Sequence, residues 1–149
     1  MTVRKILVPV DFSRQSAEAL SVAADLSRRY EAALEIVHVL NRPTYALPEG
    51  FVVPTPEQSS SVVAKIESRL AESKKEALDA GAFKVEVRVL QGFPTTEILQ
   101  VAKEEEPDLI VMGTHGRTGI EHLVIGSVAE DVVRLAPCPV LTTRALEVA

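Results

Sequence analysis

Apolar and polar residues follow one another in blocks along this chain, and the blocks predict strands and helices in regular succession. Near-continuous aliphatic runs at residues 3–10, 33–40 and 108–113 are typical of strands buried on both faces of a sheet. Residues 84–91 instead alternate apolar with polar side chains, which favours a sheet edge or a partly uncovered face. Residues 139–143 form a short fifth apolar run, so five strands are expected.

Between these strands lie four segments whose apolar residues recur at the three- and four-residue spacing of a helix. The first ends near Tyr30, and either Asp11 or Ser13 can cap its start. The second opens at Thr55, followed by proline and glutamine where helix N-termini favour them, and stops at Gly81. The third and fourth helices are expected over residues 94–106 and 127–136.

The strict alternation of strand and helix predicts an α/β fold with a mostly parallel sheet covered by helices on both sides. We therefore expect a three-layer sandwich, with residues 1–149 forming a single domain. In such sheets ligands bind past the carboxyl ends of strands, where the strand order reverses. Two segments suit that place, residues 9–11 and residues 113–127, and they converge only if the first and fourth strands are neighbours.

Residues 41–54 interrupt this pattern. Pro43, Pro48 and Pro54, together with Gly50, predict irregular structure over most of the segment. Its aromatic and aliphatic residues make it more apolar than a linker. An excursion that covers part of the core is the favoured interpretation, and a lid over a ligand is the alternative.

Composition narrows the class of protein. Hydrophobic residues make up 46% of the chain and charged residues 25%, which argues against disorder. The net charge of −5 disfavours binding to nucleic acid or to anionic membranes as the main activity. No apolar run approaches the roughly 20 residues that span a bilayer, and the N-terminal run is shorter than a signal-peptide core. A cytoplasmic location is expected.

One cysteine, Cys138, excludes an internal disulfide and a cysteine-based metal cluster. We interpret it as a small buried apolar residue in preference to a reactive thiol. The acidic run 104–106 is interpreted as a solvated helix end, and no metal site is expected from protein ligands. No nucleophile, base and orienting acid can be named together, so efficient catalysis is not expected.

The strongest chemical signal is a glycine-rich segment after the fourth strand, with Gly113, Gly116 and then Gly126 before the last helix. Backbone N–H groups at such a loop and helix start can bind an anion such as a phosphate. Glycine permits positive φ and lets phosphate oxygens approach without a Cβ in the way. Arg117 can add a charge-assisted contact. The glycine motifs of P-loop NTPases and of dinucleotide-binding folds are absent.

Each of these signals has a plainer interpretation. Residues 127–130 also read as an S-x-x-E capping box that stabilises a helix without any ligand. Asp11 can serve only as a helix cap, and His115 can form a local hydrogen bond instead of contacting phosphate. His38 and His122 are interpreted as structural or solvated residues.

The glycine spacing, G-x2-G-x9-G-S, resembles that of the nucleotide-binding branch of the universal stress protein family. The likeness covers the whole chain and includes residues 5–13, 108–116 and 136–141. This resemblance implies a Rossmann-like fold with a five-stranded parallel sheet of order 3-2-1-4-5 and four helices. In that order the first and fourth strands lie side by side.

The resemblance also implies an ATP site, with Mg²⁺ or Mn²⁺ supplied by solvent. The adenosine end would be held by Pro9, Val10, Asp11 and Val39. The floor of the site would be lined by Met112 and Gly113. The phosphates would be surrounded by His115, Gly116, Arg117, Gly126, Ser127 and Val128.

The function expected from this resemblance is an ATP-binding stress-response protein that acts as a sensor, a switch or a chaperone-like factor, with at most slow ATP hydrolysis. A homodimer is expected through residues 140–143, whose pairing with a second copy would cover an open sheet edge. One alternative is a nucleotide-independent dimeric interaction module, whose glycine loop serves only the turn. A true ATPase or nucleotidyl transferase is the second alternative.

Overall fold

The computed structural model describes residues 1–41, 45–47, 50–52, 56–114 and 126–145. Five of its strands form one parallel sheet of order β5-β2-β1-β6-β7. Their bounds are Lys5–Pro9 for β1, Ala33–Leu40 for β2, Lys84–Gln91 for β5, Leu109–Gly113 for β6 and Val140–Thr143 for β7. Counted along the sheet strands alone, this is the predicted order 3-2-1-4-5, and the α/β class is confirmed.

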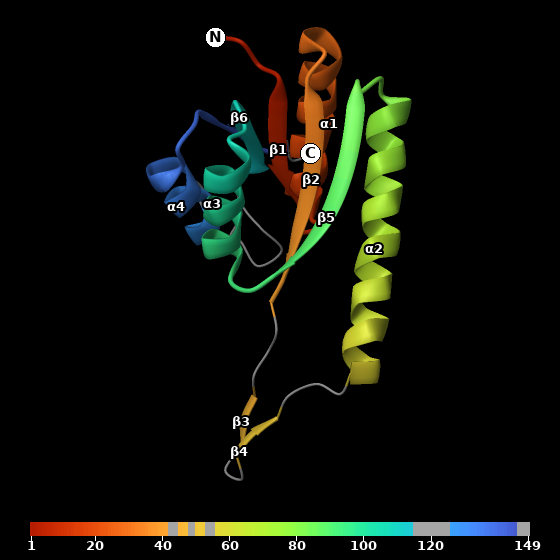
Figure 1. Ribbon diagram of the computed structural model, residues 1–149, viewed down its shortest axis with the longest axis vertical. Helices are drawn as coiled ribbons and strands as arrows, with labels where there is room; N and C mark the ends of the chain where they lie inside the picture. Colours follow the sequence, from red (N-terminus) through yellow and green to blue (C-terminus); the bar gives the residue numbers. More distant parts are fainter. Residues whose placement is uncertain (42–44, 48–49, 53–55, 115–125, 146–149) are drawn as a thin grey trace.

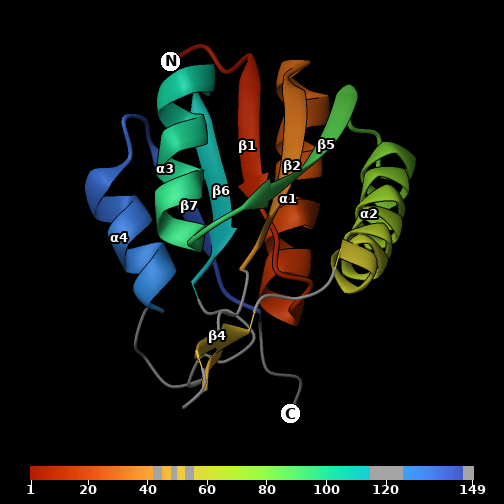
Figure 2. The ribbon, with the colours of Figure 1, turned by 60° about the horizontal axis from the view of Figure 1, so that its bottom comes forward.

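Helices cover both faces of the sheet (Figures 1 and 2). Their bounds are Arg14–Tyr30 for α1, Pro56–Asp79 for α2, Pro94–Glu105 for α3 and Ser127–Leu135 for α4. Successive residues of β1 point to opposite faces: Ile6 and Val8 pack in a core cluster with residues of α1 and α2, and Leu7 packs in a second cluster with residues of α3 and α4. The central strand is therefore buried on both faces, as its aliphatic run predicts.

The ends of the elements lie within two residues of the predicted bounds, and Asp108 shows a physical reason for one of the differences. Its carboxylate oxygen Oδ2 accepts hydrogen bonds from the backbone N–H groups of Arg4 (2.8 Å) and Lys5 (3.0 Å). Asp108 therefore joins the starts of β1 and β6 through its side chain, and the ladder of β6 begins one residue later, at Leu109. The alternating strand β5 lies at a sheet edge, as predicted.

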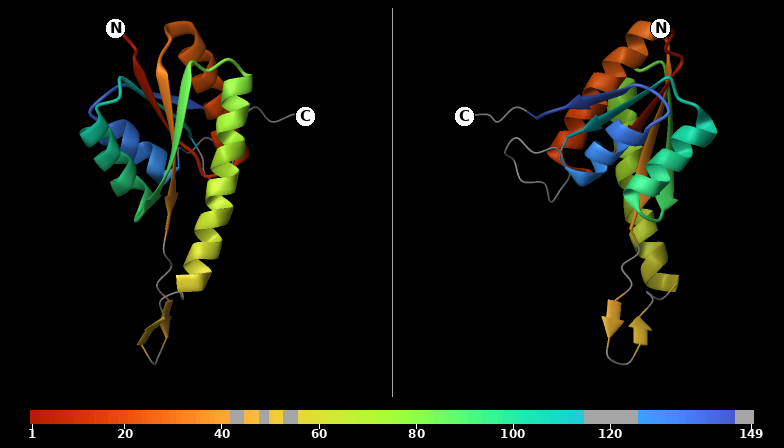
Figure 3. Two further views of the ribbon diagram at one scale, coloured as in Figure 1. Left: turned by 45° about the vertical axis from the view of Figure 1, so that its right-hand side comes forward. Right: turned by 90° about the vertical axis from the view of Figure 1, so that its left-hand side faces the viewer.

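Part of the segment 41–54, expected to be irregular over most of its length, is regular. Strands β3 (Tyr45–Leu47) and β4 (Gly50–Val52) pair antiparallel as a short hairpin. None of the three prolines of this segment lies within either strand, so each strand keeps its backbone donors. The hairpin projects beyond the carboxyl end of β2, away from the main sheet (Figures 1 and 3).

Within the part of the chain that the structure describes, no helix combines the length and the apolar character needed to cross a membrane.

Candidate functional site

The sheet reverses its order between β1 and β6. From β1 the chain moves outward through β2 to β5, then returns to the other side of β1 for β6 and β7. The two central strands pair in parallel, with Ile6 opposite Leu109 and Leu7 opposite Ile110. Their carboxyl ends therefore meet at one edge, and the two segments that the sequence singled out both start there.

The first segment is a tight turn around Asp11 between β1 and α1. Val10 is held to the neighbouring strand, because its N–H donates to the carbonyl of Val37 at 2.8 Å. The Asp11 carboxylate accepts the N–H of Ser13 at 3.0 Å, and the Asp11 N–H donates to the hydroxyl of Ser16 at 3.3 Å. Ser13 is the N-cap of α1, so Asp11 orders the turn that precedes the helix and is not its N-cap.

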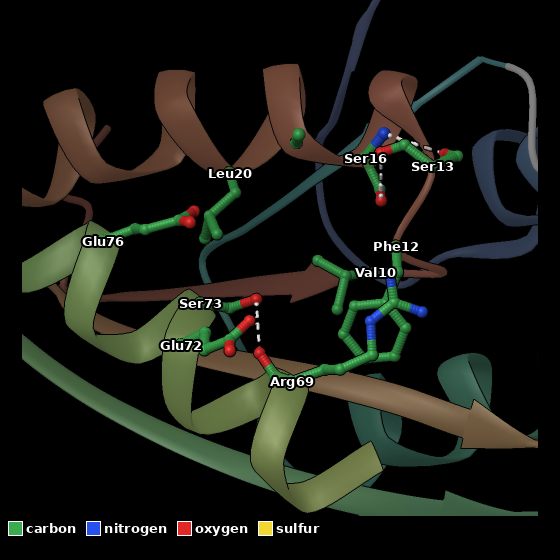
Figure 4. Close-up of a pocket in the computed structure, with 10 residues that line it drawn as sticks. Val10, Phe12, Ser13, Ser16, Leu20, Arg69, Glu72, Ser73 and Glu76 are labelled. Atoms are coloured by element: carbon green, nitrogen blue, oxygen red, sulfur yellow. Dashed lines mark hydrogen bonds between the residues drawn. The ribbon is translucent and has the colours of Figure 1, made fainter. Parts of the chain in front are cut away.

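Phe12 carries backbone strain in this turn. Its φ of 63° is left-handed, a conformation that costs a non-glycine residue roughly 1–2 kcal/mol. The ring stacks on the imidazole of His38, with centroids 4.6 Å apart. Arg69 reaches over the same ring (Figure 4), and its guanidinium carbon lies 4.4 Å from the ring centroid. The sequence predicts no role for Phe12, and only the position of this residue directly after Asp11 could have pointed to one.

Val39 and Met112, predicted to contact the nucleotide, share one side of the sheet. Both are nearly buried, with 9% and 5% of their surface exposed, and both belong to the core cluster that α3 and α4 cover. They come from strands on either side of β1, at the carboxyl half of each. The structure thus brings them to the same face, next to the strand end that carries Asp11.

Gly113 is required by packing and not by a special backbone angle. A Cβ built on it would lie 2.9 Å from Cβ of Gln15 and 3.0 Å from the backbone C and O of that residue, so α1 passes directly against it. Neither Gly113 nor Gly126 uses the positive φ that glycine permits, and the φ of Gly126 is −61°. Among the glycines that the structure describes, positive φ occurs at Gly81 and Gly92.

The start of α4 also differs from its predicted form. Gly126 is the N-cap, and glycine has no side chain with which to cap the helix. Ser127 is therefore the first helical residue, one position too late for a capping box with Glu130, and that interpretation is wrong. The Gly126 N–H donates to the carbonyl of Thr114 at 2.6 Å, and the Thr114 N–H donates to Thr143 at 3.0 Å. These bonds fix the helix start against the ends of β6 and β7.

A helix whose N-cap is a glycine has a clear chemical meaning at its start. The first N–H groups of a helix have no partner within it, and they point along the axis at the positive end of the helix dipole. At α4 these groups belong to Ser127 and its neighbours, and Ser127 is exposed. This end of α4 offers backbone donors and a hydroxyl to an anion such as a phosphate.

Several predicted site residues fall outside the described part of the chain: His115, Gly116, Arg117 and, among the residues given a structural role, His122. Their places stay predictions. Within the described ranges, no three His, Cys, Asp or Glu side chains gather closely enough to hold a metal ion. Burial, together with the charge of Asp108, raises the pKa of the half-buried Cys138 thiol, which disfavours a reactive thiolate.

Comparison with known proteins agrees with this geometry. A family model described as the universal stress protein family matches residues 2–144. Universal stress protein MJ0531 of Methanocaldococcus jannaschii is 34% identical over 147 residues, which cover 95% of this chain and 82% of that protein.

Two solved structures share the whole fold. The universal stress protein UspA from Lactobacillus plantarum superposes with a TM-score of 0.84 at 27% identity, covering 97% of this chain and 99% of its own. The universal stress protein from Archaeoglobus fulgidus, in complex with dAMP, has a TM-score of 0.69 at 25% identity and covers 95% of this chain and 98% of its own. The sheet order, the matched residues and these relatives agree, and the chain belongs to the universal stress protein family.

Proposed function

We propose that this protein binds ATP at the carboxyl ends of β1 and β6 and acts as a nucleotide-dependent sensor, switch or chaperone-like factor in a stress response. The observation that carries the proposal is the N-terminus of α4, whose N-cap is a glycine and whose Gly126 N–H is hydrogen-bonded to Thr114 at the end of β6. The Archaeoglobus fulgidus relative, solved in complex with dAMP, supports an adenine nucleotide as the ligand.

The proposed site has two ends. The adenosine end uses Pro9, Val10, Asp11 and Val39, over a floor of Met112 and Gly113. The phosphate end uses Gly126, Ser127 and Val128 at the start of α4, together with His115, Gly116 and Arg117. In this proposal Gly113 acts indirectly, because its missing Cβ lets α1 approach the end of β6.

Mg²⁺ or Mn²⁺ fits this proposal as a companion of the nucleotide, not as a resident ion. The described residues offer no cluster of carboxylates or histidines for a metal, so the donors would be phosphate oxygens and water. When bound, the cation neutralises part of the triphosphate charge. The chain's own share is to present N–H donors at α4 and to orient the adenosine end.

A second function has one observation in its favour. The close contact with Gln15 is enough to explain why residue 113 is a glycine. This suits a nucleotide-independent interaction module whose glycines are needed only for folding. The experiment below separates the two functions. A cytoplasmic location and the single-domain assignment of residues 1–149 stay predictions.

We expect Mg-ATP to stabilise the protein against heat. At 100 times its Kd a ligand that binds only the folded state adds about 2.7 kcal/mol, which for a chain of this size raises Tm by about 5 °C or more. Differential scanning calorimetry with Mg-ATP, Mg²⁺ alone and Mg-GTP measures the effect. No shift at millimolar Mg-ATP, or an equal shift with Mg²⁺ alone, would contradict the proposal.

Ser127 offers a matched pair of variants for the phosphate end. Proline is favourable at the first helical position, and Gly126 before it has an extended ψ of 154° that proline tolerates. Ser127→Pro therefore keeps the helix but removes both a backbone N–H and the hydroxyl, whereas Ser127→Ala removes only the hydroxyl. We expect Ser127→Pro to keep the Tm of the free protein and lose most of the Mg-ATP shift, and Ser127→Ala to keep more of it.

We further propose a homodimer through β7, with a second copy pairing antiparallel along its open edge. The carbonyls of Pro139 and Thr143 accept hydrogen bonds from the β6 side, so the alternating backbone groups of Thr142 face the open edge. Light scattering at micromolar concentration is expected to give twice the chain mass of 16.1 kDa. Thr142→Pro, which removes an outward N–H, is expected to shift the mass toward the monomer, while Thr142→Ala does not. A monomeric wild-type protein would refute the dimer.

A further inference from the structure

We infer that His38 is a positioning residue for the adenosine end of the site, acting through the turn that carries Asp11. The inference rests on the proposed nucleotide site and assigns a specific task within it. Neither the glycine spacing nor the resemblance gave His38 a functional role. His38 contacts the residues on both sides of Asp11.

The first contact fixes the residue before Asp11. Nδ1 of His38 lies 2.7 Å from the carbonyl oxygen of Val10. A carbonyl oxygen only accepts, so Nδ1 carries the hydrogen and donates it. The N–H of Val10 donates to Val37 at 2.8 Å. Two consecutive residues of β2 thus hold both polar groups of Val10, and only the His38 bond depends on the identity of a side chain.

The second contact fixes the residue after Asp11. The imidazole of His38 stacks on the ring of Phe12, with centroids 4.6 Å apart and the planes 29° from parallel. Phe12 has a φ of 63°, and a strained backbone of this kind persists only where surrounding contacts hold it. Arg69 lies over the same ring at 4.4 Å, so β2 and α2 both restrain Phe12.

These contacts place Asp11 between two residues that the same imidazole touches. The start of α1 orients the Asp11 carboxylate, through the N–H of Ser13 at 3.0 Å. His38 sets the backbone on either side of Asp11, and thereby the place from which this carboxylate meets the adenosine. Without the His38 bond, the turn would have to be ordered by the ligand at the moment of binding, which weakens affinity.

Two substitutions separate the hydrogen bond from the ring stack. In His38→Asn, the side-chain amide N–H can donate from close to the place of Nδ1. In His38→Phe, a ring remains to stack on Phe12, but the donor is lost. His38 is half-buried, so the asparagine amide keeps access to solvent, whereas His38→Phe removes the donor to the carbonyl of the buried Val10. Ser127→Pro serves as the control at the other end of the site.

The experiment measures Kd for adenosine, AMP and Mg-ATP by titration calorimetry, alongside the Tm of each free protein. We expect His38→Phe to weaken all three ligands by the same factor, about five- to tenfold, which is the size of one lost hydrogen bond. His38→Asn, which retains that bond but loses the ring stack on Phe12, is expected to lose less affinity than His38→Phe. Ser127→Pro is expected to weaken Mg-ATP but leave adenosine unchanged.

Three results would overturn the inference. Unchanged affinity for adenosine in His38→Phe, even with a lowered Tm, would show that His38 serves stability alone. A loss in His38→Asn as large as in His38→Phe would show that the hydrogen bond is not what positions the turn. A wild-type protein that binds none of the three ligands would refute the proposed function itself. The first two results can be told apart from this one, because in both of them the wild-type protein still binds.

Discussion

Gly113→Val is expected to lower the free energy of unfolding by about 3 kcal/mol or more, at the upper end of the usual cost of overpacking. The reason is the contact between the end of β6 and the start of α1. A Cβ at this position would lie 2.9 Å from Cβ of Gln15 and 3.0 Å from its backbone C and O. Backbone in the first turn of a helix cannot move aside as the end of a flexible side chain can. Urea unfolding, followed by circular dichroism, measures the loss as a lower midpoint.

Two milder substitutions calibrate this result. Gly113→Ala adds the Cβ alone and is expected to cost less than valine, whose two further methyl groups enlarge the clash. Gly126→Ala replaces an N-cap whose φ of −61° any residue can adopt, so we expect a cost of about 1 kcal/mol or less. A Gly113→Val protein as stable as Gly126→Ala would contradict the packing argument.

Because Gly113 packs against α1, a substitution there is a poor test of the nucleotide site. Lost binding in Gly113→Val would follow from a displaced α1 as readily as from a damaged site. Ser127→Pro avoids this ambiguity, because it alters the donors of α4 and leaves the helix able to form.

Glu35→Ala is expected to cost about 3 kcal/mol, the low end for breaking a buried ion pair. Only 11% of the Glu35 side chain is exposed, and its oxygens lie 3.0 Å from Nη2 of Arg88 and 3.5 Å from Nζ of Lys5. Among the described residues, Nε and Nη2 of Arg88 are buried without a hydrogen-bond partner, and the nearby charge of Glu35 helps to compensate them. We take the low end because 38% of the Arg88 side chain reaches solvent.

Lys5 extends this network to a third element. Its Nζ lies 2.6 Å from Oε2 of Glu105 in α3, and this hydrogen bond lowers the pKa of the Glu105 carboxyl. Burial lowers the pKa of Lys5, but its hydrogen bond to Glu105 and the charge of Glu35 outweigh that effect, and the net shift is upward. Both groups therefore stay charged at neutral pH, where the measurement is made.

A double variant distinguishes a broken ion pair from a general loss of packing. Replacing both partners of a buried pair by apolar residues of similar size is often close to neutral. Glu35→Met combined with Arg88→Met should thus recover most of the stability that Glu35→Ala loses in chemical unfolding. A double variant less stable than Glu35→Ala would show that the charges themselves stabilise the sheet.

Local patterns in the sequence were enough for most of the fold. The aliphatic runs gave the buried strands, and the alternation at residues 84–91 gave the edge strand β5, because side-chain burial imposes its period directly on the chain. Pro56 at the first position of α2 and Pro94 at that of α3 marked both helix starts. The pairing of residues 45–47 with residues 50–52 was not predicted, because prolines around two three-residue strands resemble those of an irregular loop.

The candidate site was predicted less completely. The sequence pointed to Asp11 and to the start of α4, and the structure places both at the carboxyl ends of adjacent, parallel strands. It did not reveal that Gly126 takes the N-cap from Ser127, because the two positions differ only in backbone geometry. The sequence also did not reveal the strained backbone of Phe12, because a left-handed φ cannot be inferred from the residue type phenylalanine.

By itself, the sequence determined the order in which strands and helices follow one another along the chain, the exposed character of β5, and the presence of an acid and a glycine-rich segment after two of the strands. Each of these is local, since it depends on residues close together in the chain. Only the tertiary structure decided what Gly113 and His38 do. Gly113 is a glycine because Gln15 passes against it, and His38 matters because Val10 and Phe12 lie within its reach. Both roles depend on contacts between residues that are far apart in the chain. These contacts form only when the sheet has assembled.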